Sequence, residues 1–216
     1  MRGLFVTFEG PEGCGKTTQA ARLARRLSAE GFEVVVTREP GGTPTGEALR
    51  DILQHDRSRE PIVPEAEALL FEASRAQLVR RVIRPALDRG AHVVCDRFAD
   101  STTAYQGYGR GFDVEALLRL HAFATGGTEP DLTLLLDVEV AQGFARLGGR
   151  GAGAGSGRDR FEREDRTFHE RVRAGYLALA ERWPDRIRRL DASAGPDAVE
   201  ARVWEILNER LRRGPG

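Results

Sequence analysis

The sequence predicts an α/β protein built on a doubly wound, five-stranded parallel sheet that is surrounded by helices. Short, continuous apolar segments alternate along the chain with longer amphipathic segments, which is typical of buried parallel strands connected by helices. The first apolar segment runs directly into a glycine-rich turn that opens a helix. The length of 216 residues fits a single domain of this class, and we therefore predict one domain spanning 1–216.

The individual elements follow from hydrophobic spacing and from residues that end helices. Each predicted strand is a run of apolar residues bounded by turn or charged residues, and each helix carries leucines at helical spacing. Leu23 and Leu27 show that spacing in the first helix, which Gly31 should terminate, and Pro85 should kink or divide the longest helical stretch. The predicted strands are 4–8, 33–37, 91–96, 131–137 and 186–191, and the predicted helices are 16–30, 46–54, 64–90, from about 100, 113–124, 140–147, 161–183 and 198–211.

Composition excludes several classes of protein. Lysine and arginine total 33, as do aspartate and glutamate, and Lys16 is the single lysine, so the other 32 basic residues are arginine. A net charge of zero gives no support to a bulk nucleic-acid binder, and no apolar run approaches the roughly 18 residues of a membrane span. Two cysteines, Cys14 and Cys95, are too few for a disulfide scaffold and favour the reducing cytoplasm.

The turn after the first strand, Gly-Pro-Glu-Gly-Cys-Gly-Lys-Thr, matches the phosphate-binding pattern G-x-x-x-x-G-K-[ST]. Its glycines allow backbone N–H groups to converge on phosphate oxygens, and the helix N-terminus favours anions. Lys16 should reach the β- and γ-phosphates, and Thr17 should offer its hydroxyl to Mg²⁺. The pattern predicts a P-loop NTPase fold that holds ATP with Mg²⁺ through Gly10, Pro11, Glu12, Gly13, Cys14, Gly15, Lys16, Thr17 and Thr18.

A phosphate-binding loop alone is compatible with a GTPase, an ATPase motor or a small-molecule kinase. The base-recognition pattern N-K-x-D of G proteins is absent, because Lys16 is the only lysine. The length, together with a glycine- and arginine-rich segment late in the chain, favours a nucleoside-phosphate kinase.

Seven motifs follow one another in order along nearly the whole chain. They are FEGPEG at 8–13, TREPGGT at 37–43, GEALR at 46–50, LFEASRAQ at 70–77, DRF at 96–98, AYQG at 104–107 and PDLTL at 130–134. Together they resemble the thymidylate kinases, which phosphorylate dTMP to dTDP. The resemblance implies an ATP:dTMP phosphotransferase that forms a homodimer.

The resemblance implies a specific set of contacts to the acceptor base and sugar. Phe71 offers a π-face for stacking on thymine. Arg75 donates to the thymine O4 and so disfavours the amino group of cytosine. Thr102 and Gln106 complete the contacts to the base, and Tyr105 lies under the deoxyribose. Taken one at a time, Phe71 and Tyr105 would more often be core residues, and Arg75 and Arg50 would more often be solvated charges on a helix face.

The resemblance also implies which residues contact the phosphate groups and Mg²⁺. Arg50 and Arg97 hold the acceptor phosphate, because the planar guanidinium suits bidentate phosphate contacts. Asp96, at the end of the third strand, orients Mg²⁺ together with Thr17. Glu12 faces the sugar and phosphate of the acceptor and is not a general base, since that phosphate is already ionised at neutral pH. Within the second motif, Glu39 and Pro40 belong to the acceptor site.

A mobile lid is expected at about 148–163. One branch of the family carries an arginine at the position of Gly13, and the glycine here implies the branch in which the lid supplies the arginines. Arg158 and Arg160 match the lid pattern best, and they join Lys16, Arg97 and Glu12 as the expected catalytic residues. This segment is longer and richer in glycine than is usual for the family, so Arg150 and Arg163 are alternatives, as is a flexible loop shaped by composition alone.

Arg146 resembles the adenine-stacking arginine of the family, and 191–193 resembles its adenine loop more weakly. Two other functions stay open from the sequence: a kinase for another pyrimidine nucleoside monophosphate such as dUMP, and a non-catalytic ATP-binding regulator. The complete acceptor motif set argues against the regulator, since an ATP sensor has no use for Phe71, Arg75 and Tyr105 together.

Overall fold

The apolar segments form one parallel sheet. The computed structural model describes residues 2–55, 60–148 and 160–213. The strands are β1 (Phe5–Glu9), β2 (Val34–Arg38), β3 (His92–Asp96), β4 (Leu132–Asp137) and β5 (Ile187–Asp191). Their order across the sheet is β2-β3-β1-β4-β5, and every neighbouring pair is parallel. The central strand β1 is buried along its entire length, as its apolar sequence predicts, and the predicted fold class is confirmed.

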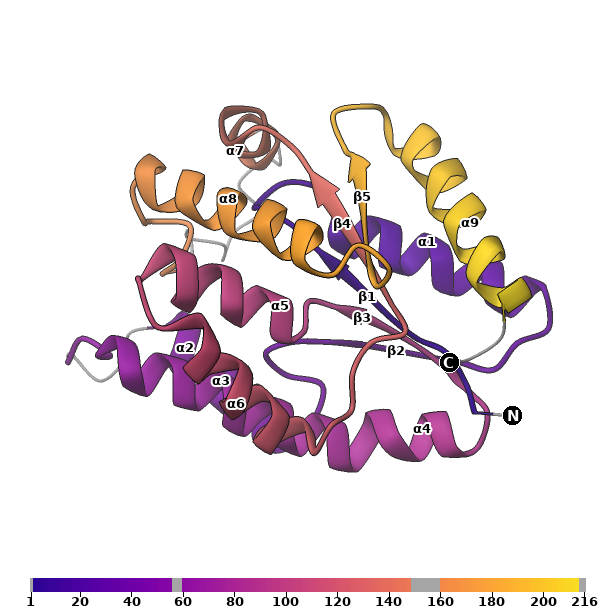
Figure 1. The fold of residues 1–216 in the computed structure, drawn as a ribbon, viewed down its shortest axis with the longest axis horizontal. Helices are drawn as coiled ribbons and strands as arrows, with labels where there is room; N and C mark the ends of the chain where they lie inside the picture. Colours follow the sequence, from indigo (N-terminus) through magenta and orange to yellow (C-terminus); the bar gives the residue numbers. More distant parts are fainter. Residues whose placement is uncertain (1, 56–59, 149–159, 214–216) are drawn as a thin grey trace.

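Helices connect the strands and cover both faces of the sheet (Figure 1). They are α1 (Lys16–Ala29), α2 (Pro44–Gln54), α3 (Pro64–Leu78), the π-helical η1 (Val79–Ile83), α4 (Arg84–Asp88), α5 (Ala99–Thr102), the π-helical η2 (Thr103–Gly109), α6 (Val114–Thr125), α7 (Val140–Gly148), α8 (Arg166–Arg182) and α9 (Pro196–Arg213). Leucines of α1 and residues of α9 pack on Val6, Phe8 and Leu134 of one face. The other face packs on α3, η1 and α4 at β3, and on η2 and α8 at β4.

Helix ends follow local capping chemistry, and this corrects one predicted boundary. The helix predicted at 161–183 begins only at Arg166, because the Asp165 carboxylate accepts a hydrogen bond from the backbone N–H of Phe168 at 2.6 Å. Gly31 follows α1 with a φ of 89°, as expected of a residue that terminates a helix. The stretch predicted at 64–90 is divided ahead of Pro85, where the π-helical turn η1 separates α3 from α4.

Within the described parts of the chain, no helix combines the length and the apolar character needed to cross a membrane. The thiols of Cys14 and Cys95 are both free and buried, and they lie in hydrophobic clusters on opposite faces of the sheet.

The register of the central strands brings two loops to one edge of the sheet. Phe8 of β1 pairs with Asp96 of β3, and the backbone N–H of Arg97 donates to the carbonyl of Phe8 at 3.0 Å. The glycine-rich turn after β1 and the residues after β3 therefore emerge side by side. In an open parallel sheet this carboxyl edge is where ligands bind.

Candidate active site

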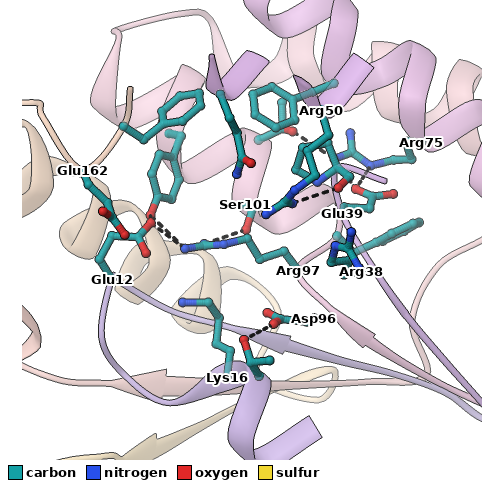
Figure 2. A pocket seen from close by; sticks show the side chains of 18 of the residues that line it. Glu12, Lys16, Arg38, Glu39, Arg50, Arg75, Asp96, Arg97, Ser101 and Glu162 are labelled. Carbon is teal, nitrogen blue, oxygen red and sulfur yellow. Dashed lines mark hydrogen bonds and ion pairs between the residues drawn. The ribbon is translucent and has the colours of Figure 1, made fainter. Parts of the chain in front are cut away.

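A cavity of about 420 Å³ opens at the carboxyl edge of the sheet (Figure 2). It gathers most of the residues that the sequence assigned to the two nucleotides, although these come from segments far apart in the chain. Its lining consists of Glu12, Gly13, Gly15, Lys16, Thr17, Arg38, Glu39, Pro40, Arg50, Gln54, Phe71, Arg75, Asp96, Arg97, Phe98, Ser101, Thr102, Tyr105, Gln106, Leu147, Phe161 and Glu162.

The glycine-rich turn has the backbone that its sequence predicts. Gly10, Gly13 and Gly15 all have positive φ, which other residues rarely adopt. A Cβ atom at Gly13 would lie 2.0 Å from the carbonyl oxygen of Gly143 in α7, so the backbone of the turn packs directly on α7. The Lys16 ammonium donates to the carbonyls of Gly10 and Pro11 at 3.0 and 2.8 Å. The turn therefore presents a buried cation and a helix N-terminus at the cavity.

Thr17 and Asp96 place side-chain oxygens beside this turn. The Thr17 hydroxyl donates to the Asp96 carboxylate at 2.5 Å, and both residues line the cavity. Across the described residues, no group of three or more histidine, cysteine or acidic side chains could hold a metal ion. A hydroxyl and one carboxylate fit Mg²⁺, which takes few protein oxygens and fills its remaining positions with water and phosphate.

Arg97 lies at the centre of the cavity (Figure 2). Its φ of 71° makes it the one non-glycine residue with a positive φ in the part of the chain that the structure describes. Its Nη2 donates to the Glu12 carboxylate at 2.7 Å, and its Nη1 donates to the Tyr176 hydroxyl at 3.0 Å. Burial alone would raise the pKa of Glu12, but the charges of Arg97 and Lys16 lower it to about 2. Glu12 is therefore an ionised anchor for Arg97, and it is not suited to accept a proton near neutral pH.

Glu9 holds the backbone that follows Arg97. One of its carboxylate oxygens accepts from the backbone N–H of Phe98 at 2.7 Å, and the other accepts from the Ser101 and Tyr176 hydroxyls at 2.6 and 3.1 Å. Burial and the charge of Asp100 raise the pKa of Glu9 to about 7, although Arg97 lowers it. These contacts keep Arg97 in its left-handed conformation and aim its side chain across the cavity.

The far end of the cavity carries Arg75, which is almost completely buried. Its guanidinium donates to the carboxylates of Glu39 and Glu72 and, at 2.9 Å, to the hydroxyl of Thr102. Burial raises the pKa of Glu39 to about 8, although the ion pair with Arg75 lowers it. Phe71 stands beside this group, with its ring centroid 5.7 Å from that of Phe161. This end therefore combines a fixed donor with an aromatic surface.

Gln106 completes that end of the cavity. Its amide Nε2 donates to Glu67 of α3 at 2.7 Å. Its Oε1 is buried, and no hydrogen-bond partner for it is found among residues 2–55, 60–148 and 160–213. A ligand or a water that supplies a donor could satisfy this acceptor.

The remaining predicted residues occupy different places. Arg50 lines the cavity and donates to the carbonyl of Pro40 at 3.0 Å. Arg146 donates to the carbonyls of Ala192 and Ser193 at 2.8 and 3.0 Å, which joins it to the segment that resembles an adenine loop. Arg160 contacts Glu67 at 2.6 Å and so lies against α3.

Besides Arg146 and Arg160, four predicted residues do not line the cavity, and two lid arginines cannot be placed. Gly10, Pro11 and Cys14 are buried within the turn, and Thr18 is exposed on the first turn of α1. Arg150 and Arg158 lie outside the described residues.

Sequence reasoning missed several residues of the site. Ser101 lies in α5, four positions after Arg97, which itself precedes that helix, and this short separation was its one signal in the sequence. Glu9 and Tyr176 had none, because their contacts to the Arg97 region join β1, α5 and α8 over long stretches of chain. The other residues that line the cavity without an individual role predicted from the sequence are Arg38, Gln54, Phe98, Leu147, Phe161 and Glu162.

Comparisons with known proteins agree on one family. The family model described as thymidylate kinase matches residues 8–203. A thymidylate kinase of Deinococcus radiodurans is 53% identical over 97% of this chain and 98% of its own, and one of Thermomicrobium roseum is 53% identical over 97% of each. The crystal structure of a thymidylate kinase from Ehrlichia chaffeensis superimposes with a TM-score of 0.76 at 33% identity, covering 96% of this chain and 99% of that one.

The raised pKa of Glu9 predicts a specific pH dependence of stability. Between about pH 4.5 and pH 7 the folded chain retains a proton on Glu9 that the unfolded chain has released, so stability falls as pH rises through this window. At about 1.4 kcal/mol per unit, the decrease is roughly 3 kcal/mol. The variant Glu9→Gln lacks this titration. We therefore expect the difference in free energy of unfolding between Glu9→Gln and the wild type, measured in urea, to shift in favour of Glu9→Gln by this amount from pH 5 to pH 8.

The exposed variant Glu205→Gln controls for loss of a carboxylate. A difference between wild type and Glu9→Gln that stays constant over this pH range would contradict the ionisation assigned to Glu9.

Proposed function

The chain belongs to the thymidylate kinase family and transfers the γ-phosphoryl group of ATP to dTMP, and we propose that the transfer takes place in the cavity of Figure 2. One observation carries this assignment. The same cavity has the phosphate-binding turn with Lys16 at one end and the donor–acceptor pair of Arg75 and Gln106 at the other. A nucleotide base and a triphosphate can therefore occupy it together, with their phosphates meeting near Arg97.

Recognition of the base follows from the hydrogen-bonding groups at the far end. Arg75 offers only donors, and the free Oε1 of Gln106 offers an acceptor. Thymine presents the complement, an acceptor at O4 and a donor at N3. Cytosine presents the opposite pattern. Its amino donor would face the Arg75 donors, and its N3 acceptor would face the acceptor of Gln106. Phe71 supplies the stacking surface, and Thr102, Tyr105, Glu39 and Pro40 complete this half of the proposed site.

Charge at the centre of the cavity serves the transfer itself. Two anionic phosphates must come together, so positive groups and correct positioning are the main requirements. We place the acceptor phosphate on Arg97 and Arg50, and the γ-phosphate on Lys16 and the backbone N–H groups of the turn. Glu12 holds Arg97 in place. No protein base is needed, because the attacking phosphate oxygen is already ionised.

Mg²⁺ would be held by the Thr17 hydroxyl and, directly or through water, by Asp96. When bound, the ion neutralises charge on the β- and γ-phosphates. Arg146 would face the adenine of ATP from the segment at 192–193 to which it is bonded. We also propose a cytoplasmic location, in keeping with two free thiols.

The acceptor specificity is tested by comparing dTMP, dUMP, dCMP and UMP in a coupled assay of ADP release. We expect dTMP to give the highest kcat/KM. We expect dCMP to be at least about 100-fold poorer, because it would leave buried polar groups facing like groups. Equal or better turnover of dCMP would contradict the role given to Arg75. Tight ATP binding without dTMP-dependent ADP release would instead indicate a regulator.

The segment at 148–163 is proposed to act as a lid that brings arginines over the γ-phosphate and excludes water. Arg158→Ala and Arg160→Ala should therefore lower kcat more than they weaken dTMP binding, with losses up to roughly 10³-fold for a transition-state arginine. Separate determination of kcat and of the dTMP dissociation constant checks this. If neither variant changes kcat, the catalytic arginine must be sought elsewhere, at Arg150 or Arg163.

We propose that the chain works as a homodimer through α3 and α6, two helices that pack against each other. Leu69 of α3 is 56% exposed and Phe123 of α6 is 86% exposed. Large apolar side chains left on neighbouring helices favour a protein–protein interface.

Light scattering should give about twice the monomer mass of 23.8 kDa for the wild type and the monomer mass for Leu69→Glu with Phe123→Glu. Val36→Glu, a change at an exposed apolar residue of the edge strand β2, should leave the mass unchanged. A wild-type monomer at micromolar concentration would contradict the proposal.

A further inference from the structure

The hydrogen bond between Gln106 and Glu67 lies at the edge of the base end of the cavity. Gln106, in η2, is only 1% exposed and lines the cavity, whereas Glu67, in α3, is 1% exposed and lies behind it. The 2.7 Å bond uses the amide nitrogen of Gln106 and leaves its buried oxygen without a partner in the described structure. The amide nitrogen of this cavity-lining residue thus makes an internal contact, and the amide oxygen is left for another partner.

The chemistry of Glu67 fixes which end of the amide faces the cavity. The oxygen and nitrogen of an amide are nearly equal in size, so only the neighbouring groups decide its orientation. A carboxylate accepts hydrogen bonds and does not donate them, so the NH₂ group must face Glu67. Glu67 is itself held by guanidinium groups, with its Oε2 at 2.6 Å from Arg160 and 3.3 Å from Arg110.

We infer that Glu67 is a positioning residue that determines which pyrimidines the acceptor site accepts. By turning the oxygen of Gln106 to the cavity, it selects bases that carry a donor at N3, and Arg75 selects bases that carry an acceptor at the neighbouring position. Thymine and uracil have both features and cytosine has neither. The inference rests on the proposed binding of dTMP at this end of the cavity and deepens it.

The variant Glu67→Gln tests the inference, because glutamine both donates and accepts and so allows the Gln106 amide to turn over. The ratio of kcat/KM for dTMP to that for dCMP should fall by roughly tenfold or more. The ratio for dTMP to dUMP should stay at the wild-type value, since these two bases present the same groups at N3 and O4. A general loosening of the site would change both ratios together.

Two further variants separate orientation of the amide from loss of the ion pairs. Arg110→Gln removes another partner of Glu67 without touching Gln106, so it should keep the wild-type dTMP:dCMP ratio. Gln106→Leu removes the amide and should itself lower the ratio. In that background Glu67→Gln should have no further effect on the ratio, because the group that it orients is gone.

The outcomes are distinct. A folded Glu67→Gln variant that turns over dTMP with an unchanged dTMP:dCMP ratio overturns the inference. So does a wild-type ratio in Gln106→Leu, which decides the matter even where Glu67→Gln does not fold. Wild-type protein that fails to phosphorylate dTMP would refute the proposed function instead, and the acceptor assay on the unmodified chain shows this first.

Discussion

The ion pair between Arg97 and Glu12 is the contact on which the geometry of the site depends. Arg97 extends from the end of β3 in a left-handed conformation that a residue with a Cβ adopts only when its surroundings require it. Glu9 stabilises this conformation by accepting a hydrogen bond from the backbone N–H of Phe98, the residue after Arg97. The hydroxyls of Tyr176 and Ser101 accept hydrogen bonds from the Arg97 guanidinium. Through these contacts, the carboxylates of Glu9 and Glu12 join β1, the phosphate-binding turn, α5 and α8. The central cation is thus fixed before a nucleotide binds, which is the preorganisation that electrostatic catalysis needs.

The excess of arginine over lysine has a structural consequence. Many arginines pair with buried acids away from the cavity: Arg173 and Arg189 both bind Asp137, and Arg186 binds Asp100. A guanidinium suits these positions because its planar fork satisfies two acceptors at once. Lys16 occupies a different environment, inside a turn whose carbonyls surround its ammonium. The zero net charge therefore combines paired structural charges with a small group of cations that face the cavity.

Much of the fold could be predicted because its signals are local. Apolar runs such as 4–8 and 131–137 located the strands to within a residue or two, and the phosphate-binding motif located the turn after β1. The helix predicted from Phe161 begins only at Arg166, although Asp165, its cap, stands in the sequence. Contacts such as Glu67 with Gln106, which lie 39 positions apart, or Tyr176 with Arg97, which lie 79 apart, could not be predicted. They depend on how helices settle on the sheet, and no periodicity in one segment encodes that.

The close approach of Gly13 to Gly143 limits which residues the phosphate-binding turn can carry. A Cβ atom at Gly13 would lie 2.0 Å from the carbonyl oxygen of Gly143, and one at Gly143 would lie 2.2 Å from the carbonyl oxygen of Glu12. A lineage with this backbone cannot acquire an arginine in the phosphate-binding turn by a single replacement. Helix α7 would first have to shift, and α7 leads directly into the segment proposed as the lid. An arginine in the turn would therefore need a compensating change in α7, so the two positions are coupled.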